Sequence, residues 1–79
     1  MGLAATEAEL ADKARRFIKA ELKRADVTYE VLAERLKEHG LTETKASIAN
    51  KLSRGTVGAT FLLATLAALE MEGLRLEDL

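Results

Sequence analysis

Two short amphipathic patterns within residues 27–55, joined by a turn that contains Gly40, constrain the fold of this chain more than any other feature. The first pattern opens at Thr28, whose hydroxyl can accept a hydrogen bond from an unpaired N–H of the first helical turn. Its apolar residues recur at helical spacing on one side, and its charged residues lie mostly on the other. Since glycine adopts the left-handed conformation at little cost, Gly40 and Gly55 are expected to end the two helices.

The second pattern begins after Leu41, with Thr42 or Thr44 as the candidate for its N-terminal cap. Ile48 and Leu52 lie four residues apart, and so they point to the same inward side. The residues that project elsewhere are small, polar or basic, namely Ala46, Ser47, Asn50, Lys51 and Arg54. A helix with such an outward face fits a groove, and the two patterns together predict a helix-turn-helix.

The segments on either side of this motif are predicted to be helices that support it. Thr6 and Glu9 have the spacing of a capping box, and an apolar stripe follows them as far as Leu22. The residues after Gly58 predict a last helix, which Gly73 ends. This helix would carry apolar side chains on nearly all of its sides. The expected fold class is all-α, a compact bundle of four main helices near residues 6–25, 28–39, 43–54 and 58–72, plus a short C-terminal turn.

A chain of 79 residues forms one domain at most. Residues 1–5 are expected to be disordered, and residues 6–79 to form a single helix-turn-helix domain. The predicted core consists of inward-facing apolar residues, namely Leu10, Phe17, Ile18, Leu32, Leu36, Ile48, Leu52, Leu62, Leu66 and Leu69. The last helix leaves a surplus of apolar residues, Phe61, Leu63 and Ala67, which predicts either a homodimer interface or a helix wrapped by its own domain.

The composition excludes several classes of protein. Cysteine is absent, which excludes disulfides and thiolate metal sites and fits a reducing cytoplasm. The longest apolar run is far shorter than the ~20 residues that span a bilayer, so a soluble, cytoplasmic protein is expected. His39 is the single histidine and no glycine-rich phosphate-binding loop occurs, so we expect no catalytic residue, metal, cofactor or small-molecule ligand. Glu30, Glu34 and Glu38 repeat every four residues, as on a solvated helix face.

The charges are sorted along the chain, although the formal net charge is only −1 at pH 7. Basic residues gather at the end of the first predicted helix and on the second helix of the motif, namely Arg15, Arg16, Lys19, Lys23 and Arg24, and then Lys45, Lys51 and Arg54. The helix dipole and ion pairs within the first helix explain its cluster without any ligand. If the two segments adjoin, they form a basic surface that can contact phosphates.

Two stretches also carry a resemblance to a known family. Residues 27–36, VTYEVLAERL, look like the first helix of that family's motif, and residues 50–55, NKLSRG, are similar to the end of its second helix. From Leu22 to Leu79 the sequence resembles the lambda-repressor-like (Cro-like) helix-turn-helix family, and still more a small bacterial domain family of unknown function with this layout. The sequence departs from the pattern in a longer link, residues 37–45, and in Tyr29, where family members commonly place an amide side chain.

The resemblance implies four or five short helices, frequent dimerisation and a second motif helix that reads the major groove of DNA. We therefore expect double-stranded DNA as the partner, a homodimer as the binding unit and transcriptional regulation as the function. The expected base-reading residues are Ser47, Asn50, Lys51 and Arg54, and the expected phosphate contacts are Lys23, Arg24, Thr28 and Tyr29. The alternative is a protein-protein interaction module of the same fold without DNA binding, which an outward face covered by Phe61 and Leu63 would favour.

Overall fold

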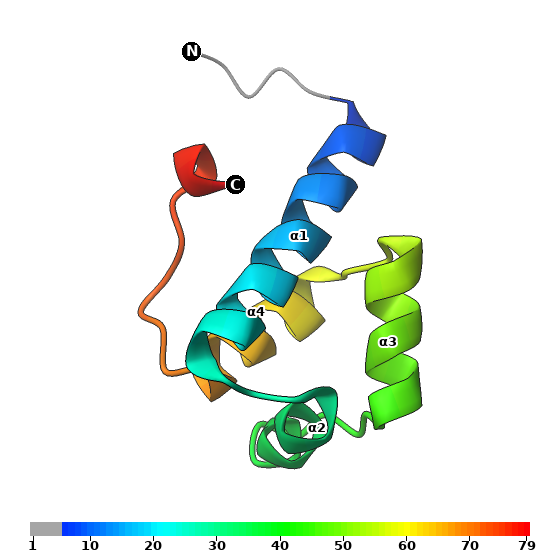
Figure 1. Ribbon diagram of the computed structural model, residues 1–79, viewed down its shortest axis with the longest axis vertical. Coiled ribbons are helices and arrows are strands. Elements are labelled where there is room, and N and C mark those ends of the chain that lie inside the picture. Colours follow the sequence, from blue (N-terminus) through cyan, green and yellow to red (C-terminus); the bar gives the residue numbers. More distant parts are fainter. Residues whose placement is uncertain (1–5) are drawn as a thin grey trace.

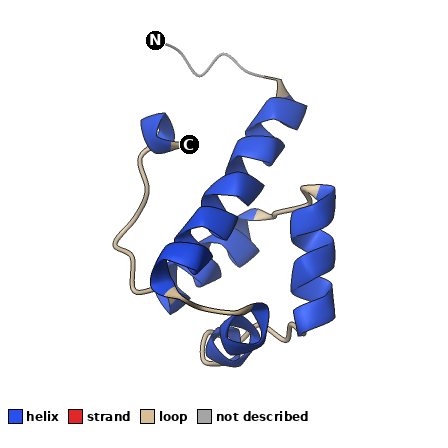
Figure 2. Cartoon of the chain, in the orientation of Figure 1, coloured by secondary structure: helices blue, strands red, loops and turns tan. Residues whose placement is uncertain are grey.

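The computed structural model describes residues 6–79 and consists of four helices (Figure 1). These are α1 (Glu7–Ala25), α2 (Tyr29–Lys37), α3 (Lys45–Arg54) and α4 (Ala59–Ala68), followed by a short 3₁₀ turn, η1 (Leu76–Asp78). No strand occurs in this described part of the chain (Figure 2), which confirms the all-α fold class. The N-terminal stretch that was expected to be disordered, residues 1–5, lies outside the described residues.

Threonine side chains start the first three helices. Thr6 Oγ1 accepts from the Glu9 N–H at 3.1 Å, while the Glu9 carboxylate accepts from the Thr6 N–H at 2.9 Å, so the predicted capping box is confirmed. That hydrogen bond from the Thr6 backbone holds the pKa of the Glu9 carboxyl below its usual value. Thr28 caps α2 as predicted, and Thr44, rather than Thr42, caps α3.

Left-handed residues end all four helices. Within residues 6–79, positive φ is found at Asp26, Gly40, Gly55 and Glu70. In each case the next N–H donates to the carbonyl five residues earlier, in the pairs Val27 to Leu22, Leu41 to Leu36, Thr56 to Lys51 and Met71 to Leu66. This arrangement is the Schellman motif, and it pairs carbonyls that a helix end otherwise leaves free. The two glycines therefore have the role predicted for them.

The last helix ends at Ala68 and not near residue 72, because Glu70 adopts φ 60° and turns the chain away. The Arg35 guanidinium on α2 donates to the carbonyl oxygen of Ala68 at 3.1 Å. A cation at the C-terminus of a helix also complements the helix dipole. The end of α4 is thereby fastened to α2, and Gly73 falls in the tail that follows.

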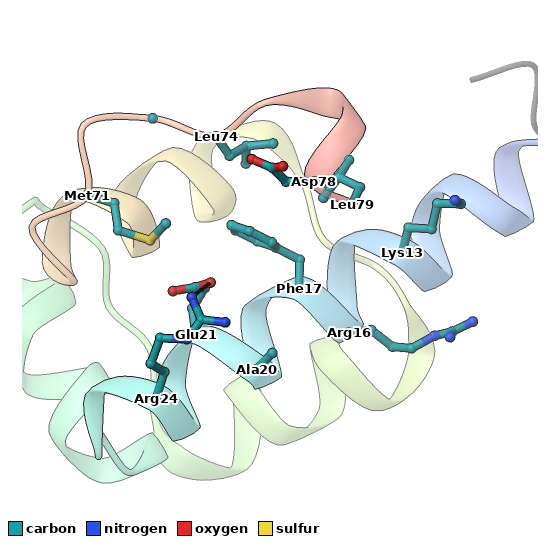
Figure 3. Close-up of a pocket in the computed structure, with 11 residues that line it drawn as sticks. Lys13, Arg16, Phe17, Ala20, Glu21, Arg24, Met71, Leu74, Asp78 and Leu79 are labelled. Atoms are coloured by element: carbon teal, nitrogen blue, oxygen red, sulfur yellow. Dashed lines mark ion pairs between the residues drawn. The ribbon is translucent and has the colours of Figure 1, made fainter. Parts of the chain in front are cut away.

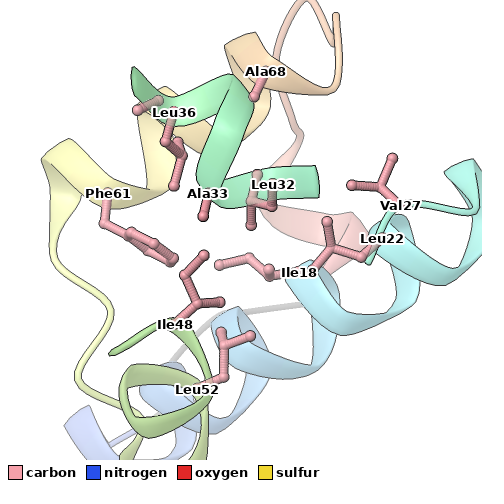
Figure 4. Packing of buried hydrophobic residues seen from close by; sticks show 11 residues of the cluster. Ile18, Leu22, Val27, Leu32, Ala33, Leu36, Ile48, Leu52, Phe61 and Ala68 are labelled. Atoms are coloured by element: carbon pink, nitrogen blue, oxygen red, sulfur yellow. The ribbon is translucent and has the colours of Figure 1, made fainter. Parts of the chain in front are cut away.

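The core forms where the four helices meet (Figure 4). The predicted core residues Ile18, Leu32, Leu36, Ile48, Leu52 and Leu66 are buried, and Phe17, Leu62 and Leu69 are half-buried at its edge. Leu10 was wrongly predicted, since 38% of its surface is exposed. The next residue, Ala11, is the one that lies against the end of α3, 3.6 Å from a Cβ placed on Gly55.

The expectation that the core leaves Phe61 free is also wrong, because its ring is only 5% exposed and belongs to the core. Phe61, Ala64, Thr65 and Ala68 follow the i, i+3, i+4, i+7 spacing that places residues on one face of a helix, and all four are buried. Leu63 lies on the other face and is 64% exposed, and Ala67, four residues on, is exposed beside it. Leu63 and Ala67, with Ala59 and Thr60 in the first turn, are the residues of α4 that face solvent.

Thr65 contains a buried hydroxyl that has no hydrogen-bond partner among the described residues. An unsatisfied buried hydroxyl costs free energy, so the near-isosteric change Thr65→Val is expected to raise the free energy of unfolding by about 1 kcal/mol. Denaturant unfolding measures the change. Thr60→Val, on the exposed side of the same helix, is the control and should stay within ~0.5 kcal/mol of the wild type. A destabilised Thr65→Val variant would contradict the prediction.

Among the described residues, no helix combines the length and the apolar character that a membrane crossing requires.

Candidate functional site

The outward face of α3 is open to solvent. Ala46, Asn50, Ser53 and Arg54 are exposed, whereas Ile48 and Leu52 on the other side are fully buried in the core. The predicted division of this helix into an anchored and an outward side is therefore confirmed. Neither Phe61, which points into the core, nor any other described segment covers Asn50 or Arg54.

The helix before α3 holds it at a steep angle. Figure 1 views α2 nearly along its axis, while α3 runs across the same view. Residues 38–44 link the two helices, a longer connection than the usual three to four residue turn of a helix-turn-helix. Gly40, within this link, ends α2, and Thr44, the last residue of the link, caps α3.

Two of the four expected base-reading residues are engaged within the chain by Glu43, which the sequence did not single out. The Ser47 hydroxyl donates to Glu43 Oε1 at 2.6 Å, and Lys51 Nζ pairs with Glu43 Oε2 at 3.1 Å. The Glu43 side chain is only 11% exposed. Lys51 Nζ also lies over the ring of Phe61, 5.6 Å from its centroid. Asn50 and Arg54 are left as the expected base readers whose side chains face solvent.

The expected phosphate contacts lie at the junction of α1 and α2. Lys23 and Arg24 are exposed in the last turn of α1, and Arg24 pairs with Glu21 at 3.1 Å. Thr28 is exposed, but its hydroxyl accepts from the Val31 N–H at 3.2 Å as the cap of α2. Tyr29 is half-buried against the core. Of these four, the two basic side chains are the ones most accessible to a ligand.

The basic side chain beside the end of α3 comes from elsewhere on α1. A Cβ placed on Gly55 would lie 3.6 Å from Ala11 Cβ and 3.9 Å from Arg15 Cδ, so α3 ends against the first half of α1. Lys23 lies about 12 Å further along that helix than Arg15, given the rise per residue. Where the two basic segments adjoin, the residue of α1 that is involved is therefore Arg15, and Lys23 lies further along α1.

Asp12 reduces the positive charge where the end of α3 lies against α1. It pairs with both Arg15 and Arg16 from the preceding turn of α1. The hydrogen bond from the Arg16 guanidinium, followed by that from Arg15, holds the pKa of the Asp12 carboxyl below its usual value. Asp12 therefore stays ionised near neutral pH and offsets part of the positive potential beside Arg54.

A shallow acidic hollow of about 390 Å³ lies between α2 and the start of α3. Its lining residues are Glu30, Val31, Ala33, Glu34, Lys37, Glu43, Thr44 and Lys45. Val31 is an exposed large apolar residue at its edge, and Lys37 pairs with Glu34 at 3.7 Å. Three glutamates and two lysines line this hollow, so its charge is only weakly negative and slightly favours a cationic partner over a phosphate backbone.

A second hollow, of about 690 Å³, separates α1 from the tail that follows α4 (Figure 3). Phe17 points into it from α1, and Met71 and Leu74 face it from the tail. Glu21 and Arg24, which pair with each other, lie at one end. This hollow was not predicted from the sequence, because it forms between α1 and a tail that is distant from it along the chain.

No group of three or more potential metal ligands occurs in residues 6–79. His39 is exposed in the turn that follows α2.

The fold and the site define a small all-helical domain with one short helix whose polar side is open. The chain belongs to the family described as Domain of unknown function (DUF6471), whose model matches residues 3–74. No curated protein matches the chain, and no solved structure matches it.

Proposed function

We propose that this domain is a helix-turn-helix protein that binds double-stranded DNA sequence-specifically and acts in transcriptional regulation, with α3 in the major groove. The observation that carries the proposal is the outward side of α3, which is polar, ends in Arg54 and is open to solvent. Because Ile48 and Leu52 are fully buried on the opposite side, the helix is held rigidly enough to present a fixed set of side chains.

Asn50 and Arg54 take different roles in this proposal. Asn50 carries the paired donor and acceptor that match the major-groove edge of adenine. Arg54, at the end of the helix, can reach guanine or a phosphate. Lys23 and Arg24 contact phosphates at the junction of α1 and α2, which adds affinity without sequence preference.

The experiment is a selection of bound duplexes from a random DNA pool at about 50 mM salt, followed by titration of the best site at increasing salt. A recurrent sequence and a steep fall of affinity with salt would support the proposal. Duplex DNA retained only at background level would overturn it.

Lys23→Ala is expected to weaken binding to every duplex alike and to reduce the slope of log K against log salt by about one, because one phosphate contact is lost. Titrations of the selected site and of a scrambled duplex measure both quantities. Lys37→Ala removes the same charge from α2, where Lys37 already pairs with Glu34 at 3.7 Å, and serves as the control. A Lys23 variant that loses affinity only for the selected site would contradict its role as a phosphate contact.

We further propose a homodimer that pairs two copies through the exposed strip of α4, Leu63 with Ala67. The support is Leu63, which is 64% exposed, whereas the other large apolar residues of α4 are buried or half-buried. With a net charge of −1, one subunit supplies few phosphate contacts, and two linked subunits would multiply their affinities. A dimer also fits two half-sites one helical turn apart.

Leu63→Glu is expected to shift the chain to monomer, since it places a charge in the proposed interface. Sedimentation at tens of micromolar measures the distribution. Val31→Glu introduces the same charge at another exposed apolar residue, on α2, and is the matched control. A wild type that sediments only as a monomer, or a Leu63→Glu variant that still dimerises, would remove α4 as the interface.

A protein-interaction module is the second candidate, and the acidic hollow between α2 and α3 favours it. Glu30 and Glu34 lie beside the exposed Val31 there, a combination suited to a basic, partly apolar segment of a partner. This candidate replaces the first if Asn50 and Arg54 variants do not alter DNA retention.

A further inference from the structure

Glu43 occupies an unusual position for an acidic residue in a domain with this proposed function. It lies one residue before Thr44, the cap of α3, and its side chain is only 11% exposed. Both of its oxygens have partners on the first two turns of that helix. Oε1 accepts from the Ser47 hydroxyl at 2.6 Å, and Oε2 pairs with Lys51 Nζ at 3.1 Å. A charge so largely withdrawn from water is retained only when it is well paired.

The groups that Glu43 holds are the ones a phosphate would need. A phosphate binds through anionic oxygens to an ammonium or a hydroxyl, as this carboxylate does. The Lys51 side chain is further tied down by its place over the Phe61 ring, 5.6 Å from the centroid. For Lys51 to contact DNA, it must exchange one anionic partner for another. The gain in free energy is then small, because the charge is already neutralised.

We propose that Glu43 competes with DNA phosphate for Lys51 and Ser47, so that these two side chains contribute little to DNA affinity. This inference rests on the proposed DNA-binding function. The competitor lowers the affinity of α3 for all duplexes. It leaves recognition to Asn50 and Arg54, whose exposed side chains it does not contact.

The central variant is Glu43→Gln, which keeps an oxygen that can accept from Ser47 but removes the charge that pairs with Lys51. Its affinity for the selected duplex is expected to rise about tenfold, with a salt slope steeper by about one. Glu34→Gln makes the same change of net charge on α2, where Glu34 is exposed, and is the control. It should raise affinity less than about threefold, through the long-range field alone.

A second pair of variants isolates Lys51. Lys51→Met should lower affinity about tenfold in the Glu43→Gln background and no more than about threefold in the wild type, where the loss comes only from the Glu43 carboxylate left unpaired, so that the double-mutant cycle shows coupling. Thermal unfolding of each variant checks that the fold is kept. Equal gains from Glu43→Gln and Glu34→Gln, or a Lys51→Met effect that is the same in both backgrounds, would overturn the proposal.

The same titrations separate this proposal from the proposed function. DNA binding that responds to Asn50→Ala but not to Glu43→Gln overturns the role of Glu43 and leaves DNA binding intact. Absence of retained DNA for both the wild type and Glu43→Gln overturns both.

Discussion

Replacement of Leu52 by alanine is expected to lower the free energy of unfolding by about 2–5 kcal/mol, because it removes a fully buried side chain and leaves a cavity. Leu52 fastens α3 to the core (Figure 4). Asn50 and Arg54 are exposed, and helical spacing places them on the opposite side of α3. The stability of a domain of this size is itself only several kcal/mol. The variant is therefore expected to be partly unfolded at room temperature, and denaturant unfolding measures the loss.

The matched control for that experiment is Leu63→Ala, the same chemical change at a side chain that is 64% exposed. It should change the free energy of unfolding by no more than about 0.5 kcal/mol at concentrations where the chain is monomeric. A loss below about 1 kcal/mol for Leu52→Ala would show that the site collapses around the cavity or that α3 is not anchored there.

Asn50→Ala is expected to cost about 1–3 kcal/mol in binding to the best duplex, roughly 5-fold to 150-fold in affinity, and to relax the preference at one base pair. The reason is that Asn50 is exposed at the middle of α3, where an amide can satisfy both groups on the edge of adenine. Binding to a panel of single-base variants of the selected duplex measures the loss and locates the base pair.

Ser53→Ala is the control for Asn50, because Ser53 is also exposed on α3 and its truncation is as mild. It should leave both affinity and base preference nearly unchanged. An Asn50 variant that loses affinity equally for every duplex would mean that the amide contacts the backbone and reads no base.

The parts of the fold that depend on residues close together in the sequence were predictable. Thr6, Thr28 and the two glycines act within one turn of helix, and their side chains or backbone freedom determine where a helix begins or ends. The inward positions of Ile48 and Leu52 follow from helical spacing alone, since their helix has one clear apolar side.

The last helix could not be oriented in the same way. Its residues are apolar nearly all round, so spacing does not distinguish Phe61, which is buried, from Leu63, which is exposed. The end of α4 was misplaced because Glu70 adopts a left-handed conformation that glutamate rarely takes. The carbonyl of Ala68 at that end accepts a hydrogen bond from Arg35, which is far away in the sequence.

The candidate site was predictable in its outline and not in its internal pairing. Helical spacing identified the outward side of α3, with Asn50 and Arg54 on it. The engagement of Lys51 by Glu43 joins residues eight positions apart across the start of a helix, and no periodic pattern reports such a contact. Arg15 beside Gly55 was likewise missed, because only the packing of α3 on α1 brings them together.

The left-handed residue that ends each helix also bears on how the domain folds. Each of the four helix ends has a hydrogen bond that reaches back only five residues, and α4 alone adds a tie from another helix, through Arg35, so the helix ends are closed mainly by the chain immediately around them. Local signals of this kind agree with the final structure before any long-range contact exists, a feature of sequences that fold quickly and without competing registers. The search for the native state is thereby reduced to packing helices of settled length against one another.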